Sequence, residues 1–274
     1  MMPEEQKPKL SFFLGSLEKE QRDSELSKKL MRLTELGFKA VEFNATDPSQ
    51  IDVASLSTQL DHCRLRASAL LTGGIYSKYR VCFASPESSV REEAVRRVAA
   101  LMPVANQLST LLVIGLIQGQ RADAADRDSA QRNIIDCLKR VGEHAERQNV
   151  HCVFEPVNHL EVGFNHTVAE VKSVLSAVGS SFLHIMADTF HLNIEESSAE
   201  DAIRACGQDL SHFHLCETNR RTFGSGHLDF QMVFRTLHEL KYDGYSTVIS
   251  ESPDWKHEAE TAMRLVSHVL NRYD

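Results

Sequence analysis

The sequence predicts an α/β fold, a closed (β/α)8 barrel in a single domain over residues 1–274. Three observations predict it: eight short apolar runs, helical stretches between them, and the lack of any long linker or low-complexity break. Repeated β-helix-β units require parallel strands covered by helices, and eight units in about 265 residues match a barrel in count and length. An open doubly wound sheet would show a glycine-rich phosphate loop after its first strand. Gly15-Ser16-Leu17-Glu18 is not such a loop.

The eight apolar runs are the candidate strands. Each is short and bounded by polar or turn-forming residues, which is typical of buried parallel strands. They span residues 10–15, 39–43, 65–71, 110–116, 150–154, 183–187, 211–215 and 245–249.

The segments between these runs have helical periodicity. In 129–147, the apolar residues 134, 135, 138, 141 and 145 recur at spacings of three and four, which places them on one helix face. Thr167 with Glu170 forms a capping box at the start of the next helix. Ser85 followed by Pro86 predicts another helix start, and Pro103 predicts a kink or an end in the helix that follows.

Composition narrows the functional classes. The chain has 30 Lys plus Arg against 38 Asp plus Glu, a formal charge of −8, and no long basic stripe, so we expect no nucleic-acid partner. The longest apolar run, 111–117, is far below the ~20 residues of a membrane span, so we expect no membrane partner. Residues 1–9 are charged and contain proline without an apolar signal core, and we expect a flexible tail. The six cysteines form no C-x-x-C pair, which predicts reduced core thiols and a cytoplasmic protein.

Polar residues at the ends of four consecutive strands mark the candidate site. Glu155, Asp188, His214 and Glu251 are spaced 33, 26 and 37 residues apart, one βα repeat each. The active site of such a barrel is built at the carboxyl ends of the strands, so these side chains are expected to converge. Any one acid could instead be a helix cap or an ion-pair partner, but four in consecutive repeats favour a shared site.

Three carboxylates cannot share a small volume as anions unless a cation neutralises them. A divalent metal held by Glu155, Asp188, His214 and Glu251 satisfies that requirement. Three oxygen donors and one imidazole suit Mn²⁺ first, with Co²⁺ or Mg²⁺ as alternatives, rather than structural Zn²⁺. About two octahedral positions remain for substrate oxygens or water.

A second polar residue follows three of these four in the adjacent loop. Glu161, His191 and Arg220 are placed where they could bind the hydroxyl groups of a polar ligand, although each alone is also a plausible solvated loop residue. His212 alternates with His214 and should also face inward, as a hydrogen-bonded barrel histidine.

Around these residues the sequence resembles the xylose isomerase-like TIM-barrel superfamily. It is most similar to the metal-dependent ketose 3-epimerases of the tagatose and psicose type, with keto-hexonate epimerases nearby. The blocks that carry the resemblance are VIGLIQG (113–119), FEPVNHLE (154–161), ADTFHLNIEE (187–196), HFHLCETNR (212–220), GSGHLDF (224–230) and ISE (249–251). The sequence departs from the usual pattern of this family at Val157-Asn158-His159 and at Cys216. Both places lie toward the substrate end of the site, so they affect the expected identity of the sugar and not the expected metal site.

The resemblance implies a role for each candidate residue. Glu155, Asp188, His214 and Glu251 correspond to the metal ligands, and Glu155 and Glu251 also to the acid–base pair. Glu161, His191 and Arg220 correspond to the residues that hold the sugar oxygens. The resemblance also implies a homodimer or homotetramer.

The predicted activity is metal-dependent epimerisation of a ketose or keto-sugar acid at the carbon next to the carbonyl. Metal chelation stabilises the enediolate, and inversion needs a base on one face and an acid on the other, for which Glu155 and Glu251 are the candidates. One alternative is an aldose–ketose isomerase of the hydroxypyruvate isomerase type, which uses one face. Another is a non-catalytic sugar- or metal-binding barrel.

Overall fold

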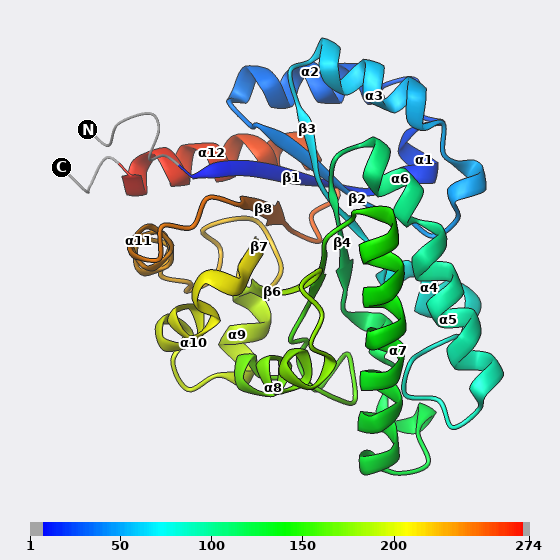
Figure 1. The fold of residues 1–274 in the computed structure, drawn as a ribbon. Coiled ribbons are helices and arrows are strands. Elements are labelled where there is room, and N and C mark those ends of the chain that lie inside the picture. The colour runs from blue at the N-terminus through cyan, green and yellow to red at the C-terminus, as the bar shows by residue number, and fades with distance from the viewer. Residues whose placement is uncertain (1–7, 271–274) are drawn as a thin grey trace.

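The computed structural model describes residues 8–270, and its strands close into a parallel barrel in the order β1 to β8. Figure 1 shows the strands at the centre and the helices around them. The predicted barrel is therefore confirmed, and each strand overlaps its predicted apolar run. The strands are β1 (Lys9–Ser16), β2 (Ala40–Asn44), β3 (Arg66–Leu71), β4 (Leu111–Ile114), β5 (Cys152–Phe154), β6 (Leu183–Asp188), β7 (Leu210–Cys216) and β8 (Tyr245–Ile249).

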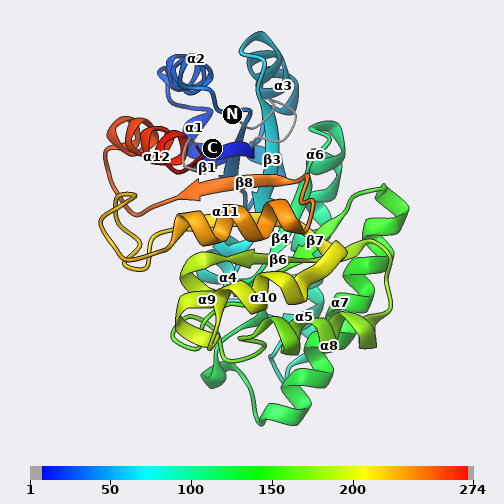
Figure 2. The same cartoon turned by 90° about the vertical axis from the view of Figure 1, so that its left-hand side faces the viewer.

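Helices follow the strands and cover the outside of the barrel, as the view turned by 90° also shows (Figure 2). The longest is α7, and four of the five residues of its predicted apolar stripe, Ile134, Leu138, Val141 and Ala145, are buried. The helices are α1 (Leu17–Glu20), α2 (Leu26–Leu36), α3 (Val53–His62), α4 (Gly73–Tyr79), α5 (Ser88–Ala100), α6 (Met102–Gln107), α7 (Arg127–Gln148), α8 (Val168–Val178), α9 (Thr189–Glu195), α10 (Ala199–Cys206), α11 (Phe230–Glu239) and α12 (Trp255–Leu270). Within residues 8–270, no helix combines the length and the apolar character needed to cross a bilayer.

Two of the three predicted helix boundaries are confirmed. Thr167 and Glu170 form the capping box of α8. The helix before Pro103 ends at Ala100, and α6 begins with this proline in its first turn. The predicted start at Ser85 is wrong, because α5 begins at Ser88. The Ser85 hydroxyl instead accepts a hydrogen bond from the Glu87 N–H, which forms a turn ahead of the helix.

The barrel closes through pairing of the first and last strands. Lys9 pairs with Tyr245 and Phe12 with Val248. The sequence predicts a flexible tail for residues 1–9, of which 1–7 lie outside the described part of the chain. At residue 9 the prediction is wrong, because Lys9 is the first residue of β1. All six cysteines are buried and unpaired, as predicted.

Side-chain alternation gives the barrel interior two halves. On β3 to β6 the inward residues Ala69, Val113, Val153 and Met186 form a small apolar cluster. On β1, β2, β7 and β8 the interior is polar and buried, and it is joined there by Ser68 of β3; its residues are Ser11, Glu42, Ser68, His212, His214 and Thr247. The apolar half contributes hydrophobic burial, whereas the polar half is stable only if its groups are hydrogen-bonded.

Candidate metal centre

Strand alternation points Glu155 and Asp188, two of the predicted site residues, into the barrel. On β5 and β6, Val153 and Met186 face inward, so Glu155 and Asp188, each two residues further on, face the same way. The Glu155 N–H donates to the Ile114 carbonyl, 2.9 Å away, which continues the strand ladder by one residue. Asp188 also caps α9 by accepting a hydrogen bond from the Phe190 N–H. Both side chains are therefore fixed by regular backbone structure.

Glu155, Asp188 and His214 meet in one buried cluster. His214 Nδ1 lies 3.6 Å from Asp188 Oδ2 and 3.9 Å from Glu155 Oε1. Ligands bound about 2.1 Å from one ion lie roughly 3–4 Å apart, so these separations fit a shared cation. His191 Nε2 joins the same group, 3.7 Å from Glu155 Oε1. Glu155, Asp188 and His191 offer ligand atoms that all lie within 4.8 Å of one another.

The electrostatics of the cluster also fit a cation. Burial, together with the Asp188 and Glu161 carboxylates, raises the pKa of Glu155 to about 8 against the opposing effects of His214 and Arg220. Burial lowers the pKa of His214, but Glu42 and Asp188 outweigh it and hold that pKa well above its usual value. Without metal, the protonated His214 ring is therefore the positive partner of Asp188, and a divalent ion bound here would take over that role as the ring loses a proton. Two carboxylates and an imidazole converging there are a donor set that fits a divalent ion.

Glu251 does not lie in this cluster. Its side chain is 73% exposed, and its nearest ionic partner is the Arg220 guanidinium, 3.8 Å away. β8 ends at Ile249, so strand alternation no longer directs a residue two positions further on. The Glu251 N–H instead donates to the Arg220 carbonyl, 2.8 Å away, which ties the loop after β8 to the loop after β7.

The three predicted ligand-holding residues lie together beside the cluster. Arg220 Nη1 is 3.1 Å from Glu161 Oε1, and Arg220 Nη2 is 3.4 Å from His191 Nε2. Burial opposes the charged form of Arg220, but Asp188 and Glu161 outweigh it and raise its pKa. The guanidinium also stacks on the Phe190 ring, 4.2 Å from its centroid. A partly buried cation with carboxylates on two sides is well placed to bind hydroxyl or carbonyl oxygens.

Glu42 is a residue that the sequence interpretation missed. It is fully buried on β2, with one oxygen 2.8 Å from His214 Nε2 and the other 2.8 Å from His212 Nε2. The Thr247 hydroxyl donates to the same carboxylate. Because Glu42 accepts the Nε2–H of His214, loss of the other ring proton would leave the Nδ1 lone pair facing Asp188 and Glu155. His212 is a hydrogen-bonded barrel histidine, as predicted. A lone acid inside the apolar run KAVEF was the available signal for Glu42.

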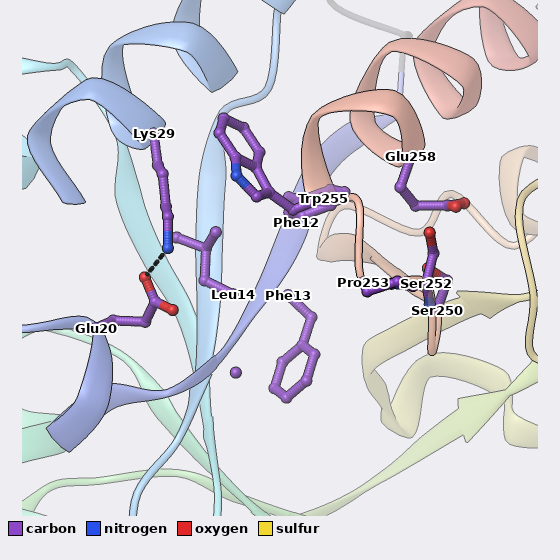
Figure 3. Close-up of a pocket in the computed structure, with 11 residues that line it drawn as sticks. Phe12, Phe13, Leu14, Glu20, Lys29, Ser250, Ser252, Pro253, Trp255 and Glu258 are labelled. Atoms are coloured by element: carbon purple, nitrogen blue, oxygen red, sulfur yellow. Dashed lines mark hydrogen bonds and ion pairs between the residues drawn. The ribbon is translucent and has the colours of Figure 1, made fainter. Parts of the chain in front are cut away.

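A cavity of about 290 Å³ lies next to the Glu251 loop. Figure 3 shows the Trp255 ring above and the Phe13 ring below, with Ser250 and Ser252 to their right. Lys29 also lines it, paired with Glu20 at 2.8 Å. Aromatic rings beside hydroxyl groups suit a polar ligand with an apolar face.

Comparison with known proteins identifies the family. The family model described as "Xylose isomerase-like TIM barrel" matches residues 30–269. The chain belongs to this family. The resemblance predicted from the sequence is therefore confirmed.

The curated relatives of this family member are named sugar epimerases. An L-ribulose 3-epimerase from Methylomonas sp. (strain DH-1) is 28% identical over 221 residues, which cover 80% of this chain and 76% of the relative. A D-psicose 3-epimerase from Agrobacterium fabrum is 26% identical over 222 residues, covering 78% and 75%. A 3-dehydro-D-guloside 4-epimerase from Escherichia coli is 28% identical over 118 residues, covering 43% and 45%.

Solved structures agree with the fold. A structure of L-ribulose 3-epimerase superposes with a TM-score of 0.82 at 20% identity, covering 97% of this chain and 95% of that one. A 3-keto-D-glucoside 4-epimerase from E. coli superposes with a TM-score of 0.80 at 17% identity, covering 97% and 100%. At this identity the superpositions show a shared barrel.

Proposed function

We propose that this family member is a divalent-metal-dependent epimerase that inverts the carbon next to the carbonyl of a ketose or keto-sugar acid. The predicted class, an enzyme that epimerises a ketose or keto-sugar, is confirmed by the curated relatives, which are named L-ribulose 3-epimerase, D-psicose 3-epimerase and 3-dehydro-D-guloside 4-epimerase. The observation that supports the metal-dependent mechanism is the buried convergence of Glu155, Asp188 and His214.

The proposed metal ligands are Glu155, Asp188, His214 and Glu251. The first three already converge, whereas the exposed Glu251 side chain has to turn toward them from the loop after β8. The oxygen-rich set favours Mn²⁺, with Co²⁺ or Mg²⁺ as alternatives. When bound, the ion would stabilise the negative charge that develops on the carbonyl oxygen of the substrate during proton removal.

Glu155 and Glu251 are the proposed acid–base pair. Inversion requires one group to remove a proton from one face of the carbon and another to return a proton on the opposite face. Glu155 is held at the end of β5 and Glu251 approaches from the separate loop after β8, so the two carboxyl groups come from different sides of the mouth. Either can begin the reaction, depending on the configuration of the substrate.

Glu161, His191 and Arg220 are the proposed sugar-holding residues. Arg220 is a fixed donor to a sugar oxygen, and Glu161 accepts hydrogen bonds from hydroxyl groups. Both lie within one connected group with His191 next to Glu155. A substrate bound there would have its reacting carbon beside the proposed base.

We further propose that residues 1–274 form one domain that works in the cytoplasm as a homodimer or homotetramer. The six buried, unpaired cysteines support a reducing compartment. Analytical ultracentrifugation of the purified protein gives the oligomeric state directly.

Deuterium exchange tests the proposed activity. The protein is incubated with Mn²⁺ and a panel of ketoses and keto-sugar acids in D₂O, and the sugars are analysed by NMR. We expect deuterium at the carbon that is inverted, C3 for a 2-ketose, with the carbonyl position unchanged. Label at C1 or C2 with a moved carbonyl would identify the isomerase alternative. No label on any sugar of the panel would favour a non-catalytic binding barrel.

Metal removal is expected to lower stability as well as activity. Dialysis against EDTA should abolish epimerisation, and adding Mn²⁺ at about 100 times its Kd should stabilise the folded state by about 2.7 kcal/mol. A thermal melt with and without Mn²⁺ measures this shift. The Asp188→Asn variant is the matched control, because the amide oxygen can still cap α9 while one charged ligand is lost. Its melting temperature should respond far less to Mn²⁺, and an undiminished response would place the ion elsewhere.

Glu251→Gln is expected to lower turnover by about 10²-fold with little change in melting temperature. The amide cannot exchange a proton, and the exposed side chain makes no buried contact whose loss would destabilise the fold. Turnover is measured in both directions with saturating Mn²⁺. Activity close to that of the unmodified protein in both directions would remove Glu251 from the acid–base pair.

A further inference from the structure

Asn158 lies in the loop after β5, fully buried, and every polar atom of its side chain is used. Its Oδ1 accepts a hydrogen bond from the Leu160 N–H, 3.0 Å away. Its Nδ2 faces two acceptors, His191 Nδ1 at 2.7 Å and Glu161 Oε1 at 3.2 Å. The Leu160 contact fixes which end of the amide is oxygen, so the –NH₂ group must point at the imidazole.

This orientation decides which ring nitrogen of His191 carries the proton. Nδ1 receives a donor from the Asn158 amide and a second, longer one from the Asn158 backbone N–H at 3.4 Å. A proton on Nδ1 would bring two donors together at 2.7 Å. Nδ1 must therefore be the unprotonated acceptor, and in a neutral ring the hydrogen lies on Nε2.

The contact between Arg220 and His191 opposes this assignment, but it is longer than the contact between Asn158 and His191. Arg220 Nη2, which can only donate, lies 3.4 Å from His191 Nε2. A donor pair at 3.4 Å is much less unfavourable than one at 2.7 Å. The Nε2 atom also faces an acceptor, since Glu155 Oε1 lies 3.7 Å away. The Nε2–H tautomer satisfies the shorter contact.

We infer that Asn158 is a positioning residue that fixes His191 as the Nε2–H tautomer, so that the ring presents a hydrogen-bond donor to an oxygen of the bound sugar. The same amide orients Glu161, an acceptor, so one buried side chain aligns a donor and an acceptor at adjacent positions. The inference rests on the proposed function only for the identity of the ligand. The tautomer itself is a property of the protein without substrate.

The experiment reads the tautomer directly. Protein labelled with ¹⁵N-histidine is examined without metal and with diamagnetic Mg²⁺, and the His191 signals are assigned by their absence in His191→Gln. We expect Nδ1 to have the chemical shift of an unprotonated nitrogen and Nε2 that of a protonated one. The reverse pattern in the unmodified protein would overturn the inference.

Two variants and a matched control test the role of the amide. In Asn158→Asp the carboxylate should draw the proton onto Nδ1, and in Asn158→Ala the preference for Nε2–H should weaken. Asn165→Asp makes the same chemical change in the same loop at a buried residue that hydrogen-bonds Gln118 and Gln131 instead, and should leave the His191 shifts unchanged. If both variants at 158 keep the Nδ1 and Nε2 shifts of the unmodified protein, Asn158 does not fix the tautomer.

The kinetic consequence separates positioning from simple structural support. Loss of an outer partner of a functional histidine is expected to reduce kcat/KM by about 10-fold or more, through KM as the donor to the sugar is lost. Asn165→Asp should lower stability to a similar extent without this change in KM. An Nε2–H ring in a protein that exchanges no ketose proton would leave the inference standing and overturn the proposed function. Ketose proton exchange by a protein whose His191 carries the proton on Nδ1 would overturn the inference and leave the proposed function standing.

Discussion

Glu155→Gln is expected to reduce turnover by about 10³-fold, even with saturating Mn²⁺. The amide has almost the same shape as the carboxyl group, but it neither removes nor returns a proton. Burial beside Asp188 raises the pKa of Glu155 to about 8, so at neutral pH the protein without metal holds this carboxyl group mostly protonated. Neutralising this position should therefore leave the melting temperature of the metal-free protein unchanged or slightly raised.

The matched control for this variant is Glu18→Gln. Glu18 is also a buried carboxylate, next to the end of β1, but it accepts hydrogen bonds from Thr46 and Asp47 and does not touch the cluster. Glu18→Gln should lower the free energy of unfolding, while its turnover should stay within a few-fold of that of the unmodified protein. Turnover is measured by product chromatography, and Mn²⁺ affinity by calorimetry. If Mn²⁺-loaded Glu155→Gln retains a tenth or more of the activity, Glu155 is not the proton-transfer group.

Glu42→Leu is expected to destabilise the fold by about 3–5 kcal/mol. The substitution leaves the buried Nε2–H groups of His212 and His214 and the Thr247 hydroxyl without their acceptor. Each unsatisfied buried group costs about 1–3 kcal/mol. Because the tautomer of His214 is no longer fixed, we also expect Mn²⁺ affinity to fall by about 10- to 100-fold. Denaturant unfolding measures the first effect, and calorimetry of the folded variant the second.

Glu258→Leu is the comparison for this prediction. Glu258 is equally buried, on α12, but it accepts one side-chain hydrogen bond, from the Phe223 N–H, and its other oxygen has no partner among residues 8–270. Glu258→Leu should lower the free energy of unfolding by less than Glu42→Leu does, and it should leave Mn²⁺ affinity unchanged. If the two variants were equally destabilised and bound Mn²⁺ equally well, the polar half of the barrel interior would not support the metal centre.

The barrel could be predicted because its pattern is local. Each apolar run and each helical stripe is readable within ten to twenty residues, and strand neighbours in a barrel follow chain order. Helix starts were harder, since Ser85 and Pro86 have the chemistry of a start but form a turn before α5.

The site was predictable only where regular structure continues to it. Glu155 and Asp188 extend or end their strands, so the alternation that points Val153 and Met186 inward directs them too. Glu251 lies beyond the end of β8, where alternation gives no direction, and its side chain is exposed. Glu42 was missed because its partners, His212 and His214, lie about 170 residues away in the sequence. Pairing across the barrel depends on closure, which no local pattern encodes.

The most direct measurement is an anomalous difference map from crystals grown with Mn²⁺. The strongest peak should lie within coordination distance of the Glu155 and Asp188 carboxylates and of His214 Nδ1, with the Glu251 side chain turned in to complete the set. If the map shows no peak between Glu155, Asp188 and His214, the proposal of a metal-dependent epimerase is wrong.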